Sequence, residues 1–386
     1  MIRSSLISLA ILSSLASSLA GQVIVPGDAS TLAEAVQLAA PGDRIFVRTL
    51  VPQAPVIIDK PLTIVGEPRL RIEIPCGQHA GLLLAGQGNG RVTVANADIV
   101  LAEECAFPDS GIAGGGFREL FLDDCTVDTR WNAFGGLSYG SPAVTVDVSL
   151  VTLHQTTISS GAPDTGTCMG PLPGDGHVGV LAPNADLVAL HSSIFGGDGG
   201  LLCCEWCSCP PSLDDWGGAG GAAAIVAHAF LVESEVLGGQ GSIADAYPGF
   251  VFDGNGVPCG VRPDGVGVDA ISNTELEANL AGTGPMRIGE RWSLSWPSPG
   301  DIAWVFGATR HAAPWVLGGP GSGGQGIVFL DPTSLFLQVV VPVQLGFGEY
   351  ELNVPPIVDL IGTSLVFQVY DDQLGLTSPV YRIVGS

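Results

Sequence analysis

The sequence has little positive charge. Only 14 of its 386 residues are basic, a single one of them is lysine (Lys60), and 38 acidic residues bring the formal net charge to −24. A surface this acidic repels nucleic acid, anionic membranes and polyanionic sugars unless divalent cations intervene. We therefore expect no nucleic-acid partner and no cofactor, unless calcium bridges the acidic groups.

Long hydrophobic runs are also missing beyond the N-terminus, where about 18 uninterrupted apolar residues would be needed for a spanning helix. We therefore expect no membrane insertion. The first residues read MIRSSLISLAILSSLASSLAGQ, with Arg3, a short apolar stretch, and small residues at Ser18 and Ala20. This pattern is typical of a secretory signal peptide. It predicts that residues 1–20 are removed by cleavage after Ala20 and that the mature protein is soluble and secreted, or held at the cell surface.

What the sequence does have is glycine, at 55 positions, and a charged fraction of only 13%. Many small residues and turns favour short strands over long helices. One helix is nevertheless well marked, because Thr31 and Glu34 form a capping-box pattern and Pro41-Gly42 would end the helix. Three strands are expected after it, at about 44–48, 55–58 and 62–65.

A repeat follows. Six segments each show two alternating apolar residues, a polar step, and one more apolar residue. The last apolar positions are Ile99, Val127, Ile158, Ile194, Val236 and Leu276, at intervals of 28, 31, 36, 42 and 40 residues. Such a long and elastic period suits stacked coils with variable loops rather than propeller blades. We predict that these residues form one file inside the stack.

The segment after the helix carries a family resemblance. Its residues are Pro41, Gly42, Asp43, Ile45 and Val47, then Lys60, Pro61, Leu62, Ile64 and Gly66. This order resembles the start of the pectin-lyase-like right-handed parallel β-helix proteins. The resemblance implies an all-β fold with a capping helix over the first coil. We expect about seven coils spanning roughly 44–277, within a β-helix domain of residues 21–280.

The variable intervals place three long loops on one side of the coils, at 161–176, 198–220 and 240–264. Four of the nine cysteines fall in the middle loop, in LLCCEWCSCPP. Export favours disulfides over a zinc site or a reactive thiol. A structural zinc site usually needs two separated pairs of ligands. Because nine is odd, one cysteine is free or bonded to another molecule. We expect disulfides among six cysteines of the loops: Cys168, Cys203, Cys204, Cys207, Cys209 and Cys259.

After about residue 280 the pattern changes to short alternating strands separated by Gly/Pro turns. We expect seven strands, at about 286–296, 301–309, 325–330, 335–341, 348–353, 363–370 and 379–384. So many strands in about 100 residues predict a small antiparallel β-sandwich over residues 281–386.

The fold implied by the resemblance hosts lyases, hydrolases, esterases and proteins without catalysis, so it sets no activity. Of the polygalacturonase-like motifs only the Asp-Asp pairs are present, and the pectin methylesterase motifs are absent. Aligning the apolar file nevertheless stacks ionisable residues at the polar step, roughly 4.8 Å apart. The candidate catalytic residues are Asp123, Asp124, His154, His191 and Glu233. The favoured alternative is that these residues form a row of solvated polar side chains. The sequence does not specify a metal for them.

Two tryptophans of the cysteine-rich loop, Trp206 and Trp216, could stack on sugar rings, although a small core of the loop itself is the favoured alternative. The sequence thus favours a secreted, non-catalytic protein that binds an extracellular glycan or an envelope component, or that builds an envelope or matrix. The alternative is a carbohydrate-active enzyme, a polysaccharide lyase or glycoside hydrolase acting on a neutral or unusual glycan.

Overall fold

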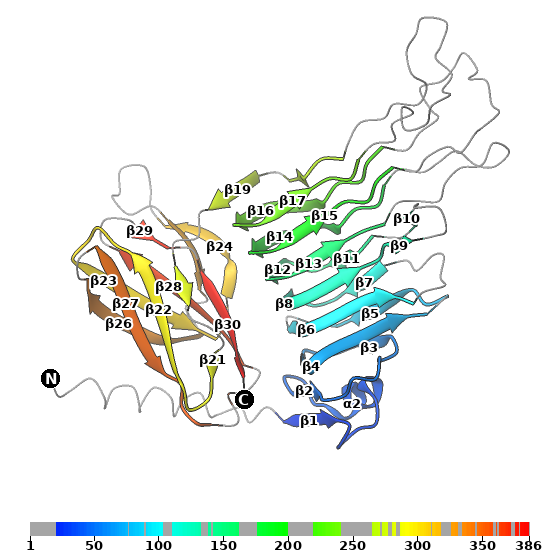
Figure 1. The fold of residues 1–386 in the computed structure, drawn as a ribbon, viewed down its shortest axis with the longest axis horizontal. Helices are drawn as coiled ribbons and strands as arrows, with labels where there is room; N and C mark the ends of the chain where they lie inside the picture. Colours follow the sequence, from blue (N-terminus) through cyan, green and yellow to red (C-terminus); the bar gives the residue numbers. More distant parts are fainter. Residues whose placement is uncertain are drawn as a thin grey trace, which may run out of the picture. The chain divides into compact units, whose positions relative to one another are not determined.

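The chain folds into two compact units, Gly21–Glu275 and Leu276–Ser386 (Figure 1). The computed structural model describes residues 21–385 except for 76, 89, 103–109, 133–137, 140–141, 162–175, 200–218, 241–264, 271, 277–279, 283–285, 310, 318–325, 331–333, 344–345, 358–359, 361–362, 372–374 and 378. Within these residues the protein is all-β apart from short helical segments. No helix in the described part of the chain is long and apolar enough to span a membrane.

The first unit is built on one large sheet of 17 strands. The strands are β1 (Gln22–Val25), β2 (Arg44–Val47), β3 (Val56–Ile58), β4 (Thr63–Ile74), β5 (Ala80–Ala85), β6 (Arg91–Leu101), β7 (Ser110–Gly115), β8 (Glu119–Asp128), β11 (Val144–Asp147), β12 (Leu150–His154), β13 (Thr157–Ser159), β14 (Val180–Leu190), β15 (Ser193–Phe195), β16 (Ala224–Val232), β17 (Glu235–Leu237), β18 (Val268–Asp269) and β19 (Ser272–Leu276). A short hairpin, β9 (Trp131–Asn132) and β10 (Ser138–Tyr139), lies outside this sheet.

The pairings form three parallel ladders. The first joins β1, β2, the starts of β4, β6 and β8, then β12 and the later parts of β14 and β16. The second joins the later parts of β4, β6 and β8 with β13, β15 and β17. The third joins β3, β5, β7, β11, the starts of β14 and β16, and β18. We call one passage of the chain through the three ladders a layer; the stacked layers are compatible with a parallel β-helix.

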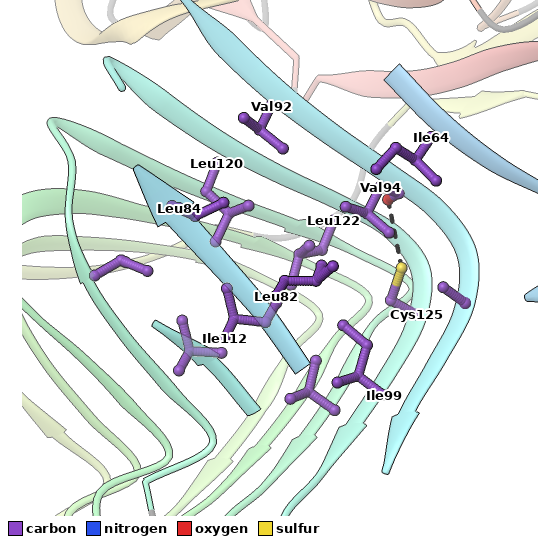
Figure 2. Close-up of a cluster of buried hydrophobic side chains, with 14 of the residues drawn as sticks. Ile64, Leu82, Leu84, Val92, Val94, Ile99, Ile112, Leu120, Leu122 and Cys125 are labelled. Carbon is purple, nitrogen blue, oxygen red and sulfur yellow. Dashed lines mark hydrogen bonds between the residues drawn. The ribbon is translucent and has the colours of Figure 1, made fainter. Parts of the chain in front are cut away.

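The predicted interior file exists. Ile99 pairs with Val127, and the file continues through Ile158 and Ile194 to Val236. The side chains from Ile99 to Ile194 are fully buried. Figure 2 shows aliphatic side chains from several layers, including Ile64, Leu82, Val94 and Ile99, pointing into the shared interior. The prediction is therefore confirmed as far as Val236, while the side chain of Leu276 lies outside the described residues. In the second ladder the stacked rows are buried on the inward face, and residues between them, such as Arg71 between Leu70 and Ile72, face outward.

The predicted helix is α2 (Leu32–Leu38), which buries Leu32, Ala35 and Val36 in the core of the first unit. The Thr31 side chain accepts a hydrogen bond from the Glu34 N–H at 3.2 Å. The Glu34 carboxylate accepts from the N–H and hydroxyl of Ser30 rather than from Thr31, both at 2.7 Å. The capping pattern thus marks the helix start correctly, with the return bond one residue earlier than in a standard capping box.

The second unit holds small, mostly antiparallel sheets. One contains β20 (Ala281–Gly282), β22 (Arg291–Pro297) and β27 (Phe347–Asn353). Another contains β21 (Met286–Arg287), β23 (Ile302–Ala308), β26 (Leu335–Pro342), β28 (Ser364–Asp371), β29 (Gly375–Leu376) and β30 (Val380–Gly385); β24 (His311–Leu317) pairs with β25 (Gly326–Leu330). Side chains of both larger sheets share one core, in which the Trp292 and Phe367 rings lie 4.9 Å apart. Each of the seven predicted strand ranges overlaps an observed strand, whereas β24 was not predicted.

Candidate functional site

The polar step of the repeat is a sharp bend between the first and second ladders. At this bend five successive layers place a non-glycine residue in the left-handed region, with φ between 43° and 52°: Asn96, Asp124, Gln155, His191 and Glu233. Such residues are uncommon and are mostly small or polar. The bend therefore turns the chain by about the same amount in each layer and projects a row of polar side chains.

The residue after each bend points inward and closes the backbone of the bend. The Thr156 hydroxyl donates to the His154 carbonyl at 2.9 Å and accepts from the Cys125 N–H at 3.3 Å. Ser192 and Ser234 repeat the arrangement, each accepting an N–H from the preceding layer. We call Cys125, Thr156, Ser192 and Ser234 the inner ladder. Its hydroxyl groups accept hydrogen bonds from backbone N–H groups at the bend. A buried N–H without an acceptor would lower the stability of the fold.

Cys125 begins the inner ladder and is 1% exposed. Its thiol lies 3.4 Å from the Val94 carbonyl, the contact drawn in Figure 2, and 3.3 Å from the Asp123 carbonyl. Burial raises the pKa of the Cys125 thiol to about 12, and the charge of Asp123 acts in the same direction. This thiol is therefore a poor nucleophile in the folded protein.

On the outer side of the bend the structure brings four of the five candidate catalytic residues into one line. Asp123 Oδ1 lies 2.5 Å from His154 Nδ1, and His154 is only 4% exposed. The rings of His154 and His191 meet edge to face with centroids 6.3 Å apart. His191 Nδ1 then lies 3.3 Å from Glu233 Oε2, where both side chains are well exposed. The line therefore runs from a buried pair, Asp123 and His154, to an exposed pair, His191 and Glu233.

The predicted register of these residues was wrong by one position in one layer. His154 pairs with Asp123 below it and with Leu190 above it, so it precedes the bend, whereas His191 and Glu233 lie at the bend. The bend position of that layer belongs to Gln155, which sequence reasoning missed because it carries no titratable group. The sequence signal that marks the bend is its spacing from the interior file. Each bend residue lies three positions before a residue of the file, as Gln155 lies before Ile158.

Asp124, the fifth candidate, faces a different partner. Arg69 reaches across the layers and donates to Asp98 at 2.6 Å and to Asp124 at 2.9 Å. It also contacts the side chains of Asn96 and Thr126. Burial alone would lower the pKa of the guanidinium, but the hydrogen bonds and charges of the two aspartates outweigh it and the pKa is raised. Asp124 is thus part of an ion cluster around Arg69.

The chemistry available to the line Asp123–His154–His191–Glu233 is proton exchange between imidazoles and carboxylates. Within the described part of the chain no group of three or more His, Cys, Asp or Glu side chains is arranged to hold a metal ion. The expected calcium therefore remains a prediction. Whether any of the five residues is catalytic also remains a prediction.

The long loops leave the layers through a stack of glycines. We call Gly161, Gly176, Gly196, Gly197, Gly220, Gly221, Gly238, Gly239 and Gly265, together with His177, the glycine stem. Backbone N–H groups of Gly197, Gly221, Gly239 and Gly265 donate in turn to the carbonyls of His177, Gly197, Gly221 and Gly239, at 2.7–2.9 Å. Outgoing and returning chain ends therefore alternate, and a Cβ on Gly221 would lie 2.2 Å from the His177 carbonyl oxygen. Burial lowers the pKa of His177 at the same place.

The loop residues named in the sequence analysis lie outside the described residues. They are the two tryptophans, Trp206 and Trp216, and the six cysteines Cys168, Cys203, Cys204, Cys207, Cys209 and Cys259. Their ligand-binding and disulfide roles remain predictions. The glycine stem nevertheless shows that the three loops are rooted side by side.

The comparisons with known proteins give no further assignment. A scan against protein families finds no match to the chain, and a search of curated proteins finds no similar sequence. The features of the protein that bear on function are therefore the geometry of the layers, the line of ionisable residues and the glycine stem.

Proposed function

We propose that the first unit is a right-handed parallel β-helix of the pectin-lyase-like superfamily, with about seven coils and α2 as its N-terminal cap. The parallel register of three ladders and the interior file support this fold. The mostly antiparallel pairing of the second unit and its single core support a β-sandwich module. The sequence pattern of residues 41–66 supports the superfamily.

We further propose that the protein is secreted after removal of residues 1–20 and acts without catalysis, in extracellular binding or as part of an envelope or matrix. Its partner would be an extracellular glycan or an envelope component rather than nucleic acid, and the acidic chain would not insert into a membrane. The single observation that carries this proposal is the glycine stem. It roots three long loops next to one another on a rigid stack, as a binding surface built from loops requires.

The pairing of the candidate residues supports the same interpretation. Asp124 is engaged by Arg69, Asp123 by His154, and Glu233 by His191. Glycoside hydrolysis usually needs two carboxyl groups on opposite sides of a sugar, about 5–10 Å apart. Carboxylates held in one file along a bend, each with its own cationic or imidazole partner, fit a structural row better than such a pair.

A carbohydrate-active enzyme, lyase or hydrolase, is the second candidate. The observation that favours it is the row of two imidazoles and two carboxylates, in which the exposed Glu233–His191 pair could exchange a proton with a substrate. Under this alternative His191 and Glu233, the exposed members, would contact the substrate. Asp123 would orient His154, because a carboxylate on Nδ1 fixes the imidazole tautomer.

Binding and catalysis can be separated in one experiment. The mature chain is screened against an array of neutral and acidic glycans, with calcium and with a chelator, and the solutions are analysed for cleavage products. The binding proposal expects retention of at least one glycan without products, and loss of retention in Trp206→Ala and Trp216→Ala. Phe347→Ala, which removes an exposed ring of the second unit, is the control and should bind normally.

The enzyme alternative expects products that disappear in His191→Asn and Glu233→Gln but persist in Glu235→Gln. Glu235 lies two residues beyond Glu233 and takes no part in the line of ionisable residues. If no glycan binds and none is cleaved, the glycan part of both proposals is wrong. N-terminal sequencing of the exported protein tests secretion separately, with Gly21 as the expected first residue.

A further inference from the structure

One sheet of the second unit ends in an open strand. In the strand order β21, β30, β28, β23, β26, strand β26 comes last and pairs only with β23 among the described residues. The pairing is antiparallel and regular from Leu337 to Pro342, after a bulge at Phe336. The other side of β26 thus carries backbone N–H and C=O groups for which the described part of the chain provides no strand.

The side chains of β26 are almost all apolar, in the sequence LFLQVVVP. Leu337, Val339 and Val341 face the core of the second unit but are only partly buried against it. On the opposite face Val340 is 55% exposed. The core of the second unit is therefore incompletely covered along this edge.

Strand β27 shows how the same unit protects another edge. It is last in its own sheet, in the order β20, β22, β27, and it carries the exposed residues Glu349 and Glu351. Charged side chains of this kind disfavour pairing of an edge strand with another chain. β26 has no such protection, because no charged residue occurs between Asp331 and Glu349. Only the bulge at Phe336 and the proline at Pro342 limit the open part of β26.

The backbone geometry decides which residues of β26 face the open side. The Val343 N–H donates to the Asp301 carbonyl, toward β23, at 2.9 Å. Because successive residues of a strand direct their backbone groups to alternate sides, Gln338 and Val340 direct theirs to the open side. Pro342 faces the same side, where the N–H that proline lacks is not needed for the pairing with β23. The donors of the open side are therefore the N–H groups of Gln338 and Val340.

The occupant that fits this edge is a second copy of the chain. With 38 acidic and 14 basic residues, two copies repel each other over most of their surface. The uncharged stretch around β26 is a place where they can meet without opposing like charges. An uncharged edge has no charge with which to select a foreign charged segment, whereas the same strand of a second copy brings matching backbone groups and apolar side chains. Two identical strands pair antiparallel about a twofold axis, which closes the assembly at two copies.

We propose that β26 pairs antiparallel with β26 of a second copy, centred on Val339, and that the protein forms a symmetric dimer through this edge. Gln338 of each copy lies opposite Val340 of the other, and the two residues exchange backbone N–H···O=C hydrogen bonds. Val339 meets Val339, and Leu337 meets Val341, so the partly buried rows of the two copies cover each other. The two sheets become one continuous sheet across the twofold axis.

This dimer is weak and depends on salt. A single strand pair buries less than the roughly 1,200–2,000 Å² of a stable interface, so we expect a dissociation constant in the micromolar range. The negative charge of each copy opposes association, and salt screens this repulsion. Raising the salt concentration therefore lowers the dissociation constant, which is opposite to its effect on a contact between unlike charges.

The test is sedimentation velocity of the mature chain over a series of protein concentrations, at low and high salt. Val340→Pro removes an N–H of the open side without breaking a bond to β23, and Val340→Glu places a carboxylate there. Ile357→Glu is the control, because it adds the same charge at a side chain that is 43% exposed and lies outside β26 and β23. Hydrogen exchange of residues 335–342 shows whether β26 is the protected strand, and urea unfolding of each variant shows that it folds.

We expect a reversible equilibrium between monomer and dimer, tighter at high salt, with slower exchange in residues 335–342 as the concentration rises. Both Val340 variants should raise the dissociation constant at least about tenfold, and Ile357→Glu should leave it unchanged. A monomer at every concentration in high salt would overturn the proposal. So would a dimer that Val340→Pro leaves intact, protection of β27 instead of β26, or protection of β26 only when a foreign peptide is added.

Discussion

The lower and upper layers of the first unit stabilise the same bend by different means. In the lower layers, around residues 63–128, Arg69 joins the outer side chains of adjacent layers and the inward position holds Ala97 or Cys125. In the upper layers, around residues 150–237, the hydroxyls of Thr156, Ser192 and Ser234 bond from layer to layer on the inside. One backbone geometry is thus held by exposed charge in one half and by buried hydroxyl groups in the other.

The glycine stem adds a requirement at the roots of the three long loops of the upper layers, and its loss should have the largest effect. Gly221→Val places a branched side chain where even a Cβ would lie 2.2 Å from a carbonyl oxygen. We expect the free energy of unfolding, measured in urea, to fall by roughly 3 kcal/mol or more, since the backbone must move. Gly88→Ala is the control, because no atom lies within 4 Å of its Cβ position. Equal effects of the two changes would contradict the stem.

Removing one hydroxyl of the inner ladder should come next. Thr156→Val keeps the shape but leaves the buried Cys125 N–H without its acceptor, at an expected cost of about 2 kcal/mol in unfolding free energy. Thr156→Ser keeps the hydroxyl and should cost less than half as much. Thr157→Val, at the next position and pointing outward, should change little. If Thr157→Val is as damaging as Thr156→Val, the ladder does not stabilise the bend.

In the lower layers the matching change is Arg69→Met. It leaves Asp98 and Asp124 without their shared cation, and we expect a loss of about 1–2 kcal/mol that shrinks in high salt, because the guanidinium is partly exposed. Arg71→Met is a matched control, since the Arg71–Glu73 pair is more exposed and should contribute at most about 0.5 kcal/mol. A salt-independent loss would indicate packing of the Arg69 stem rather than charge.

The smallest effect is expected from the thiol of Cys125, the residue at which the lower layers meet Thr156 of the upper layers. The pKa of Cys125 is raised from 9.0 to about 12 on folding. The unfolded chain therefore releases this proton at lower pH than the folded protein, and stability is lost as pH rises from 9 towards 12. Between pH 8 and pH 10 the wild type should lose about 1 kcal/mol more than Cys125→Ser, compared by urea unfolding at each pH. Parallel pH profiles for the two proteins would contradict this assignment.

Much of the fold could be predicted because it follows from apolar spacing. The sequence predicts the interior file from Ile99 to Val236 and the start of α2 at Leu32. Both can be predicted because alternating apolar residues and a capping pattern are each recognised within a few neighbouring positions. The candidate site was harder. Aligning the apolar file placed His154 level with His191 and Glu233, whereas the bend residue of its layer is Gln155. The partners of Arg69 could not be predicted from the sequence. They belong to neighbouring layers, and their positions depend on the path of the chain after Gly66.

The glycine stem also bears on how such a protein could change over time. Because the strands on either side of each long connection keep one fixed pitch, the length and composition of a loop are uncoupled from the register of the core. A loop can gain or lose residues between its two glycine anchors without shifting the layers above or below it. New recognition properties could therefore arise on this side of the molecule while the aliphatic interior stays the same.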